Sequence, residues 1–156
     1  MEIFGSSGVR GIVGETLTPG EAVQVAQAAG AVLDADRAVV ARDTRRTGDM
    51  FVDAAASGLA SVGCDVDKVG IVPTPALQAY CESEAVPGVM VTASHNPPEF
   101  NGIKLVGSDG VGLTSDDLDR VETRLHADQS LAGWDETGES RRIEGVRRSY
   151  REQLLA

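Results

Sequence analysis

One segment of the chain joins an apolar run to a stretch in which a regular helix cannot form. Residues 88–91, GVMV, are apolar throughout and are typical of a buried strand. The stretch that follows, TASHNPPEFNGIKL at residues 92–105, contains Pro97 and Pro98, which cannot continue a helix and which stiffen the chain. Its Asn and Gly residues suit a tight loop. Ser94 is therefore predicted to lie on a rigid corner at the end of a strand, which is where α/β sheets carry chemistry.

Helix and strand signals alternate along the chain. The best signalled helix is predicted at 18–34, where Thr18, Pro19 and Glu21 form a capping box before apolar residues at helical spacing. In a later helix, Thr74 is expected to cap and Pro75 to begin the helical part. The alternation predicts an α/β layered sandwich with a mixed sheet of about four strands between helices. The predicted strands are 37–41, 66–72, 88–92 and 103–106, and the other predicted helices are 48–62, 75–84 and one that opens at 114.

The last thirty residues change character. The apolar pattern fails from 127 to 145, so a loop is predicted there, with a short edge strand near Ile143. Helical spacing returns at Val146, Tyr150 and Leu154, but this stripe is expected to have few partners in the domain. We therefore assign residues 1–144 to a domain and 145–156 to the start of a linker helix, which would fray or self-associate through 146–154.

Composition narrows the classes of partner. The 24 acidic and 14 basic residues give a net charge of −10, which argues against nucleic acid and anionic membranes as partners. Only two of the basic residues, Lys68 and Lys104, are lysines, and this acidic, lysine-poor surface predicts a halophilic, salt-rich cytoplasm. Without a membrane-length apolar stretch or a signal peptide, a cytoplasmic location is expected. Cys64 and Cys81 lack metal-ligand spacing and are interpreted as core thiols.

Three segments resemble motifs of the phosphohexomutases, the superfamily of phosphoglucomutase, phosphomannomutase and phosphoglucosamine mutase. Residues 92–105 resemble the active-site serine loop of that superfamily. Residues 4–11, FGSSGVRG, are similar to its FGTSGxRG segment, with Ser6 in place of Thr. Residues 41–48, ARDTRRTG, are similar to its GRDTRxSG loop, with Ala41 for Gly and Thr47 for Ser.

The resemblance implies roles for particular residues. Ser94 would be carried as a phosphoserine and would bind Mg²⁺ through its phosphate. Lys104 is the first candidate for the general base, because the high pKa of an arginine makes proton abstraction difficult. The other catalytic or phosphate-binding and substrate-binding contacts would come from Arg10, His95 and Asn96, and support for the loop from Arg42 and Asp43.

The resemblance also implies a larger protein. Members of the superfamily have four domains, and the Asp-rich metal loop, the sugar loop and the C-terminal phosphate loop are not found in these 156 residues. We expect the intact protein to interconvert hexose 1-phosphate and 6-phosphate through a bisphosphate, which also serves as activator. These residues alone would be inactive, with domains II to IV as their partners. The sugar could be glucose, mannose or glucosamine phosphate. The alternative is a stand-alone binding module that keeps the serine loop without catalysis.

Two other interpretations are weaker. The adjacent Ser94 and His95 could form a hydrolase pair in which histidine deprotonates serine. Neighbouring side chains of an extended chain point to opposite sides, however, and no G-x-S-x-G elbow surrounds Ser94, so we expect the two side chains not to meet. A dinucleotide site is not expected either. Gly5, Gly8 and Gly11 recur every third residue, which differs from the spacing of the G-x-G-x-x-G fingerprint.

The acidic surface leads to a first prediction. If its excess charge is a salt adaptation, molar potassium chloride will screen the repulsion between carboxylates and raise the melting temperature. Thermal melts at low and molar salt measure this, with a neutral-surface domain of similar size as the control. A melting temperature that stays flat or falls would contradict the interpretation.

Overall fold

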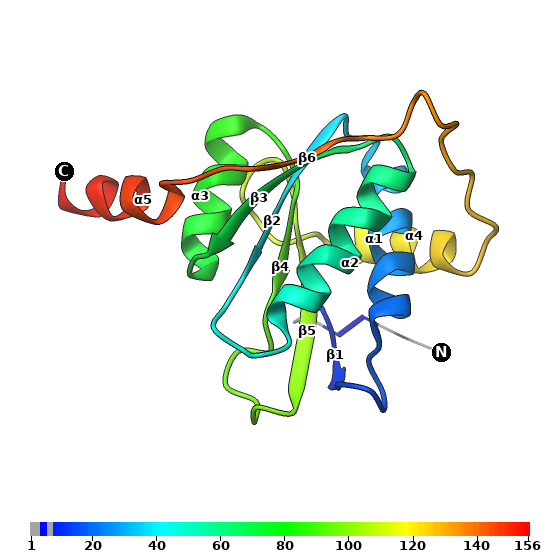
Figure 1. Ribbon diagram of the computed structural model, residues 1–156, viewed down its shortest axis with the longest axis horizontal. Helices are drawn as coiled ribbons and strands as arrows, with labels where there is room; N and C mark the ends of the chain where they lie inside the picture. The colour runs from blue at the N-terminus through cyan, green and yellow to red at the C-terminus, as the bar shows by residue number, and fades with distance from the viewer. Residues whose placement is uncertain (1–3, 6–7) are drawn as a thin grey trace.

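The computed structural model describes residues 4–5 and 8–156, which form one mixed sheet with helices on both faces (Figure 1). Its strands are β1 (Val9–Ile12), β2 (Arg37–Arg42), β3 (Asp65–Ile71), β4 (Gly88–Val91), β5 (Phe100–Val106) and β6 (Ser140–Arg142). Their order in the sheet is β1-β5-β4-β2-β3-β6. The pairs β2–β3, β2–β4 and β3–β6 are parallel, and β1–β5 and β4–β5 are antiparallel. The α/β class and the mixed sheet are confirmed, whereas the count of about four strands is wrong, since the described residues form six.

The helices form two layers. One face of the sheet is covered by α1 (Pro19–Leu33), α2 (Gly48–Ser61) and α4 (Ser115–Leu125). The other is covered by α3 (Thr74–Glu84), and the start of α5 (Val146–Leu155) packs beside α3. The central strand β2 serves both layers, because Val40 packs with the first cluster and Val39 and Ala41 pack with the second. Both faces of β2 are therefore buried, as is usual for a central parallel strand. No helix of the described residues is long and apolar enough to cross a membrane.

The helix starts follow the predicted capping with one exception. Thr18 caps α1, with its hydroxyl accepting from the Glu21 backbone N–H at 3.3 Å and the Glu21 carboxylate accepting from the Thr18 N–H at 3.0 Å. Thr74 was expected to cap α3 but is the first helical residue, and the extended Pro73 stands before it. Pro75 then falls in the first turn, where its missing N–H costs no hydrogen bond.

The two strands beyond the four predicted ones, β1 and β6, lie at the edges of the sheet. β1 was not among the predicted strands, but it pairs antiparallel with β5, with Val9 opposite Ile103. β6 lies close to the edge strand predicted near Ile143, and its three residues are all exposed. Neither strand has an apolar alternation, because one is glycine-containing and four residues long and the other buries no side chain. Ser6 and Ser7 of the N-terminal motif lie outside the described residues.

A buried carboxylate joins β6 to the rest of the sheet. Asp67 of β3 is fully buried, and its two oxygens accept from Arg141 of β6 at 2.7 Å, from Arg37 of β2 at 2.8 Å and from Tyr80 of α3 at 3.0 Å. Burial raises the pKa of Asp67, but the hydrogen bonds from Arg141, Tyr80 and Arg37 outweigh it and hold the pKa below its ordinary value. The carboxylate therefore stays charged, and it ties three strands and a helix together.

The C-terminal helix is partly packed. Few partners were expected for this stripe, and two of its residues have them, since Val146 is buried and Tyr150 packs partly buried against the cluster under α3. Leu154 is 67% exposed and extends beyond that cluster. Figure 1 shows α5 leading away from the sheet at the C-terminal end. The division at residue 144 stays a prediction.

The two cysteines are core residues, as the sequence predicted. Cys64 and Cys81 are both free and buried. Burial raises the pKa of each thiol to about 12. A thiol with so high a pKa is protonated at neutral pH and is a poor nucleophile.

The second prediction concerns Asp67. Asp67→Asn should lower the free energy of unfolding by about 3 kcal/mol at pH 7, because it leaves two arginines without their buried carboxylate. Since the folded pKa is depressed, this stabilisation is complete above the unfolded pKa of about 3.9 and is lost as the pH falls through the folded pKa. Urea unfolding of both proteins across this acid range measures the difference.

The matched control is Asp53→Asn, which breaks the exposed ion pair with Lys68. It should change stability little, since exposed pairs contribute little. A difference between Asp67→Asn and the wild type that does not shrink in acid would contradict the assigned ionisation of Asp67.

Candidate active site

The loop between β4 and β5, residues 92–99, is here called the serine loop. Ser94 is exposed and has φ of 56°, a left-handed conformation that residues other than glycine rarely adopt. Its backbone N–H donates to Thr92 Oγ1 at 3.0 Å, and the Asn96 N–H donates to the Ala93 carbonyl at 3.0 Å. These hydrogen bonds hold the turn from within and leave the Ser94 hydroxyl displayed to solvent.

The loop that follows β2 reaches the serine loop from the side. Because β2 and β4 are parallel neighbours, their carboxyl ends lie at the same edge of the sheet. The Asp43 N–H donates to the Val91 carbonyl at 3.1 Å, and Asp43 Oδ2 accepts from Thr92 Oγ1 at 2.6 Å. Thr92 Oγ1 also accepts from the Ser94 N–H, so the Thr92 hydroxyl bridges the predicted supporting residue Asp43 and the Ser94 backbone.

Arg45 makes the most numerous contacts with the serine loop. Its guanidinium donates to four backbone carbonyls, those of Ser94 at 2.9 Å, Asn96 at 2.7 Å, Pro97 at 2.7 Å and Phe100 at 3.2 Å. From the sequence, Arg45 was only one member of a charged loop. No local pattern marks it, because its acceptors are main-chain atoms 49 to 55 residues away.

The Arg42 side chain makes its hydrogen bonds within its own loop. It was expected to brace the serine loop, but it donates to the carbonyls of Asp43 at 3.0 Å and Arg45 at 2.8 Å and pairs with Asp49 at 3.2 Å. These contacts hold the loop of residues 43–47. Arg42 therefore acts on the serine loop indirectly, through Asp43 and Arg45.

A buried amide connects the start of β5 to the start of α2. Asn101 is fully buried, donates from Nδ2 to Thr47 Oγ1 at 2.9 Å and accepts from the Gly102 N–H at 2.8 Å. Thr47 is the N-cap residue of α2 but makes no side-chain capping bond, and its hydroxyl serves Asn101 instead. The loop of residues 43–47 is thus also linked to β5, the strand that follows the serine loop.

Arg10 enters the site across β5. It lies in β1 opposite Gly102, and its Nη1 donates to Asn96 Oδ1 at 3.0 Å, so the structure brings the predicted residues Arg10 and Asn96 together. Gly102 leaves room for this crossing. A Cβ at Gly102 would lie 2.9 Å from Arg10 Cγ and 2.7 Å from the carbonyl oxygens of both Thr92 and Val9. Arg10 Nε is buried without a hydrogen-bond partner among the described residues.

Ser94 and His95 meet, contrary to the expectation from an extended chain. Ser94 Oγ lies 3.3 Å from His95 Nδ1. The left-handed backbone of Ser94 is the reason, because it breaks the alternation of side chains on which that expectation depended. No carboxylate of the described residues is hydrogen-bonded to the other ring nitrogen, so the base lacks the orienting group of a hydrolase triad.

Lys104 lies farther along the sheet. It is half-buried in β5 opposite Met90 of β4, and its side chain has no hydrogen bond or ion pair with any described residue. The structure therefore does not bring Lys104 into hydrogen-bond contact with Ser94. Its ammonium is left without an internal partner, while that of Lys68 is paired with Asp53.

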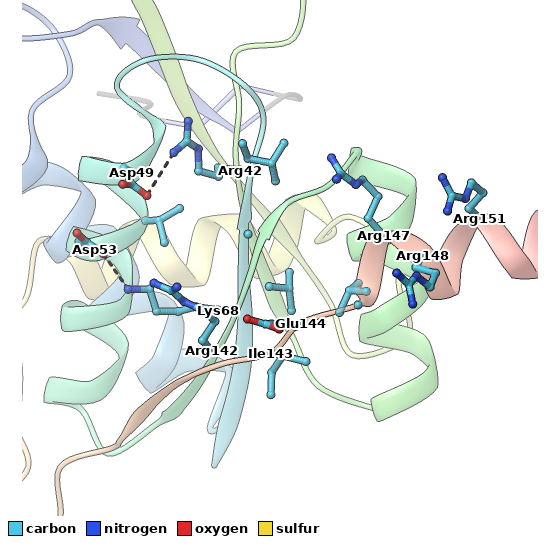
Figure 2. Close-up of a pocket in the computed structure, with 16 residues that line it drawn as sticks. Arg42, Asp49, Asp53, Lys68, Arg142, Ile143, Glu144, Arg147, Arg148 and Arg151 are labelled. Carbon is cyan, nitrogen blue, oxygen red and sulfur yellow. Dashed lines mark hydrogen bonds and ion pairs between the residues drawn. The ribbon is translucent and has the colours of Figure 1, made fainter.

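A basic groove of about 1080 Å³ begins at Arg42, the last residue of β2 (Figure 2). It runs between α2, β3, β6 and α5, and Ser94 does not line it. Two of its cations are paired, Arg42 with Asp49 at 3.2 Å and Lys68 with Asp53 at 2.8 Å. The others come from β6 and α5, namely Arg142, Arg147, Arg148 and Arg151. The groove thus gathers positive charge in a chain whose net charge is −10.

The described residues do not form a metal site by themselves, since they contain no group of three or more His, Cys, Asp or Glu side chains that could hold an ion. Asp43, the carboxylate linked to the serine loop, is already engaged by Thr92 and Arg45. The predicted Mg²⁺ contact through a phosphate on Ser94 stays a prediction.

The fold and the loop together define an α/β/α domain that displays a strained serine at the carboxyl edge of its sheet. Residues 1–132 match the family model described as "Phosphoglucomutase/phosphomannomutase, alpha/beta/alpha domain I". The chain belongs to the phosphoglucomutase/phosphomannomutase family.

Individual relatives agree with this assignment. The chain is 48% identical over 139 residues to the phosphoglucosamine mutase of Pediococcus pentosaceus, covering 83% of this chain and 30% of the relative. It is 44% identical over 160 residues to the phosphoglucomutase/phosphomannomutase of Thermococcus kodakarensis, covering 98% and 35%. The crystal structure of a phosphoglucomutase/phosphomannomutase family protein from Burkholderia thailandensis superposes with a TM-score of 0.85 at 30% identity, covering 99% and 35%. The chain spans about a third of the length of these proteins.

The third prediction tests the crossing of Arg10 over β5. Gly102→Ala should destabilise the fold by about 1–3 kcal/mol, because the added methyl group meets two backbone carbonyls and the Arg10 side chain. It should also detach Arg10 from Asn96 and shift the Asn96 side-chain resonances in NMR spectra. Gly112→Ala is the matched control, since a Cβ there meets only Lys104 Cε at 3.9 Å. Equal unfolding midpoints for the two variants would show that β5 and β1 tolerate the methyl group.

Proposed function

We propose that this chain is the first domain of a hexose phosphate mutase and that Ser94 carries the phosphoryl group between the two positions of the sugar. The observation that carries the proposal is the conformation of Ser94, an exposed hydroxyl on a left-handed residue in a loop held by Asp43 and Arg45. Strain of this kind persists only where the surroundings impose it, and it is concentrated at functional sites. The mutase names of relatives at 44% and 48% identity support the reaction class.

The proposed reaction consists of two phosphoryl transfers. In the first, the P–Oγ bond of phosphorylated Ser94 breaks and a P–O bond forms to the free hydroxyl of a hexose 1-phosphate, giving a bisphosphate. The sugar hydroxyl loses its proton to a base, and Ser94 Oγ keeps the bonding electron pair and takes up a proton. In the second, Ser94 Oγ gives up its proton and forms a P–O bond to the phosphoryl group at position 1, whose sugar oxygen keeps the bonding electron pair and takes up the proton held by the base, and hexose 6-phosphate is released. Each transfer breaks one P–O bond and forms one, so the enzyme ends as it began.

Residues of this chain can fill the accompanying roles. His95 Nδ1 lies 3.3 Å from Ser94 Oγ and is placed to supply the proton that this oxygen takes up. Arg10, held beside the loop through Asn96, would stabilise the charge on the phosphoryl oxygens. Lys104 remains our candidate for the base that receives the sugar proton. It has no internal partner, but it would require the substrate or a closed cleft to bring the reacting hydroxyl to it.

Mg²⁺ would neutralise charge on the phosphoryl group as it transfers. This chain would contribute the phosphate on Ser94 as one ligand, and the remaining ligands would come from other domains of a full-length mutase. A sugar bisphosphate would activate the protein by placing the first phosphate on Ser94.

The fourth prediction places the phosphate. After incubation of the full-length protein with a hexose bisphosphate and Mg²⁺, peptide mapping should find one phosphate within residues 92–104. Ser94→Ala should remove the label and lower kcat by at least about 10³-fold, because the nucleophile is gone. Ser83→Ala is the control, since it removes an exposed hydroxyl on α3. Label on Ser6 or Ser7 instead would contradict the assignment.

The same assay separates the mutase from a binding module. The 156-residue chain alone should show no turnover of glucose 1-phosphate with bisphosphate and Mg²⁺. A full-length protein that also shows none with glucose, mannose or glucosamine phosphates, and takes no label, would favour the module.

A further inference from the structure

We infer that Arg45 is the positioning residue that holds Ser94 in its left-handed conformation and thereby sets the rate of phosphoryl transfer. This inference rests on the proposed function of Ser94. It concerns a residue outside the predicted site, whose guanidinium contacts the main chain of the serine loop and not the reacting side chains.

The geometry shows how one side chain can define the loop. Arg45 Nη2 donates to the carbonyls of Ser94 and Asn96, and Nη1 donates to those of Pro97 and Phe100. The acceptors begin at Ser94 itself and end at the first residue of β5, so the clamp spans nearly the whole loop. Thr92, before these acceptors, is held separately by Asp43.

The guanidinium is itself fixed in place. Its side chain is only 12% exposed, and Nε lies 3.4 Å from Asp43 Oδ2, an ion-pair contact without hydrogen-bond geometry. The Arg45 backbone is held as well, because its N–H donates to Asp43 Oδ1 at 3.1 Å and its carbonyl accepts from Arg42 at 2.8 Å. The clamp is therefore rigid before any substrate arrives.

The planar guanidinium group of arginine is needed to bind these four carbonyls. A guanidinium presents five N–H donors in fixed directions and can serve two pairs of carbonyls at once, whereas a lysine ammonium has three donors around a single point. Lysine at position 45 would keep the charge but could not reach all four acceptors. This difference allows an experiment to separate charge from geometry.

The clamp also has an electrostatic consequence for a phosphorylated Ser94. The four carbonyl oxygens carry partial negative charge. Their hydrogen bonds orient them toward the nearly buried guanidinium of Arg45. A loop released from Arg45 would turn these oxygens toward solvent, where they would repel a phosphate dianion. Arg45 thus stabilises the position of the Ser94 hydroxyl and also the negative charge of a phosphate bound to it.

The experiment compares Arg45→Lys and Arg45→Ala with Arg46→Ala, a control that removes an exposed arginine from the same loop. In the full-length protein, both Arg45 variants should lower kcat by about 10²-fold while KM changes by less than about threefold, because misplacement by about 1 Å costs this much in the transition state. In the 156-residue chain, amide exchange at residues 94–101 should quicken at least tenfold in both variants. Arg46→Ala should match the wild type in both measurements.

The outcomes distinguish this inference from the proposed function. Wild-type kcat and wild-type loop exchange in Arg45→Lys would overturn the positioning role, and so would equal losses in Arg45→Ala and Arg46→Ala. If Arg45→Ala does not fold, Arg45→Lys carries the same comparison, because it keeps the charge and the aliphatic stem. A wild-type protein that turns over without label on Ser94 would overturn the proposed function, and the role of Arg45 in phosphoryl transfer with it. In that case, faster amide exchange of the loop in the Arg45 variants would still show that Arg45 holds the loop, and only the proposed role of Ser94 in phosphoryl transfer would be wrong.

Discussion

The parallel pairing of β2 with β4 places two loops at one edge of the sheet, and the site is built on that adjacency. Each strand ends where its neighbour ends, so the loop of residues 43–47 lies against the serine loop although about 50 residues separate them in sequence. Arg45, Asp43 and Thr47 each use this proximity, through backbone carbonyls, Thr92 and Asn101 respectively. Without this pairing, Ser94 would lose the contacts from Arg45 and Asp43 that help to hold it in a conformation that it would otherwise avoid.

Two fully buried polar side chains serve as joints in this fold. Asn101 links β5 to the start of α2, and Asp67 links β3 to β2, to β6 and to α3. Each has hydrogen-bond partners at both of its polar ends, which is the condition under which burying such groups does not destabilise a protein. Asn101 acts next to the serine loop, whereas Asp67 acts at the opposite side of the sheet, where β6 leads into α5 and the basic groove.

Local signals predicted the regular part of the fold. The capping box at Thr18 and the Thr114 cap are properties of a few adjacent residues, and the predicted helices and central strands lie within a few residues of the observed ones. β1 was missed and β6 only approximated, because β1 is four residues long and β6 buries no side chain, so pairing and not hydrophobic pattern decides where they form. The stripe at Val146 and Tyr150 gained partners under α3 for a similar reason, since contacts between distant elements leave no periodic trace.

The sequence by itself determined the α/β class and the position of Ser94 after a buried strand, because strand runs, prolines and caps act over short distances. The tertiary structure decided which groups surround that serine. It brought Arg10 to Asn96 across Gly102, placed His95 against Ser94 through a left-handed backbone, and left Lys104 without a partner. It also selected Arg45, and not Arg42, as the residue that holds the loop. The physical reason is that Arg45 recognises main-chain carbonyls, which every residue possesses, so only the folded chain shows which of them it binds.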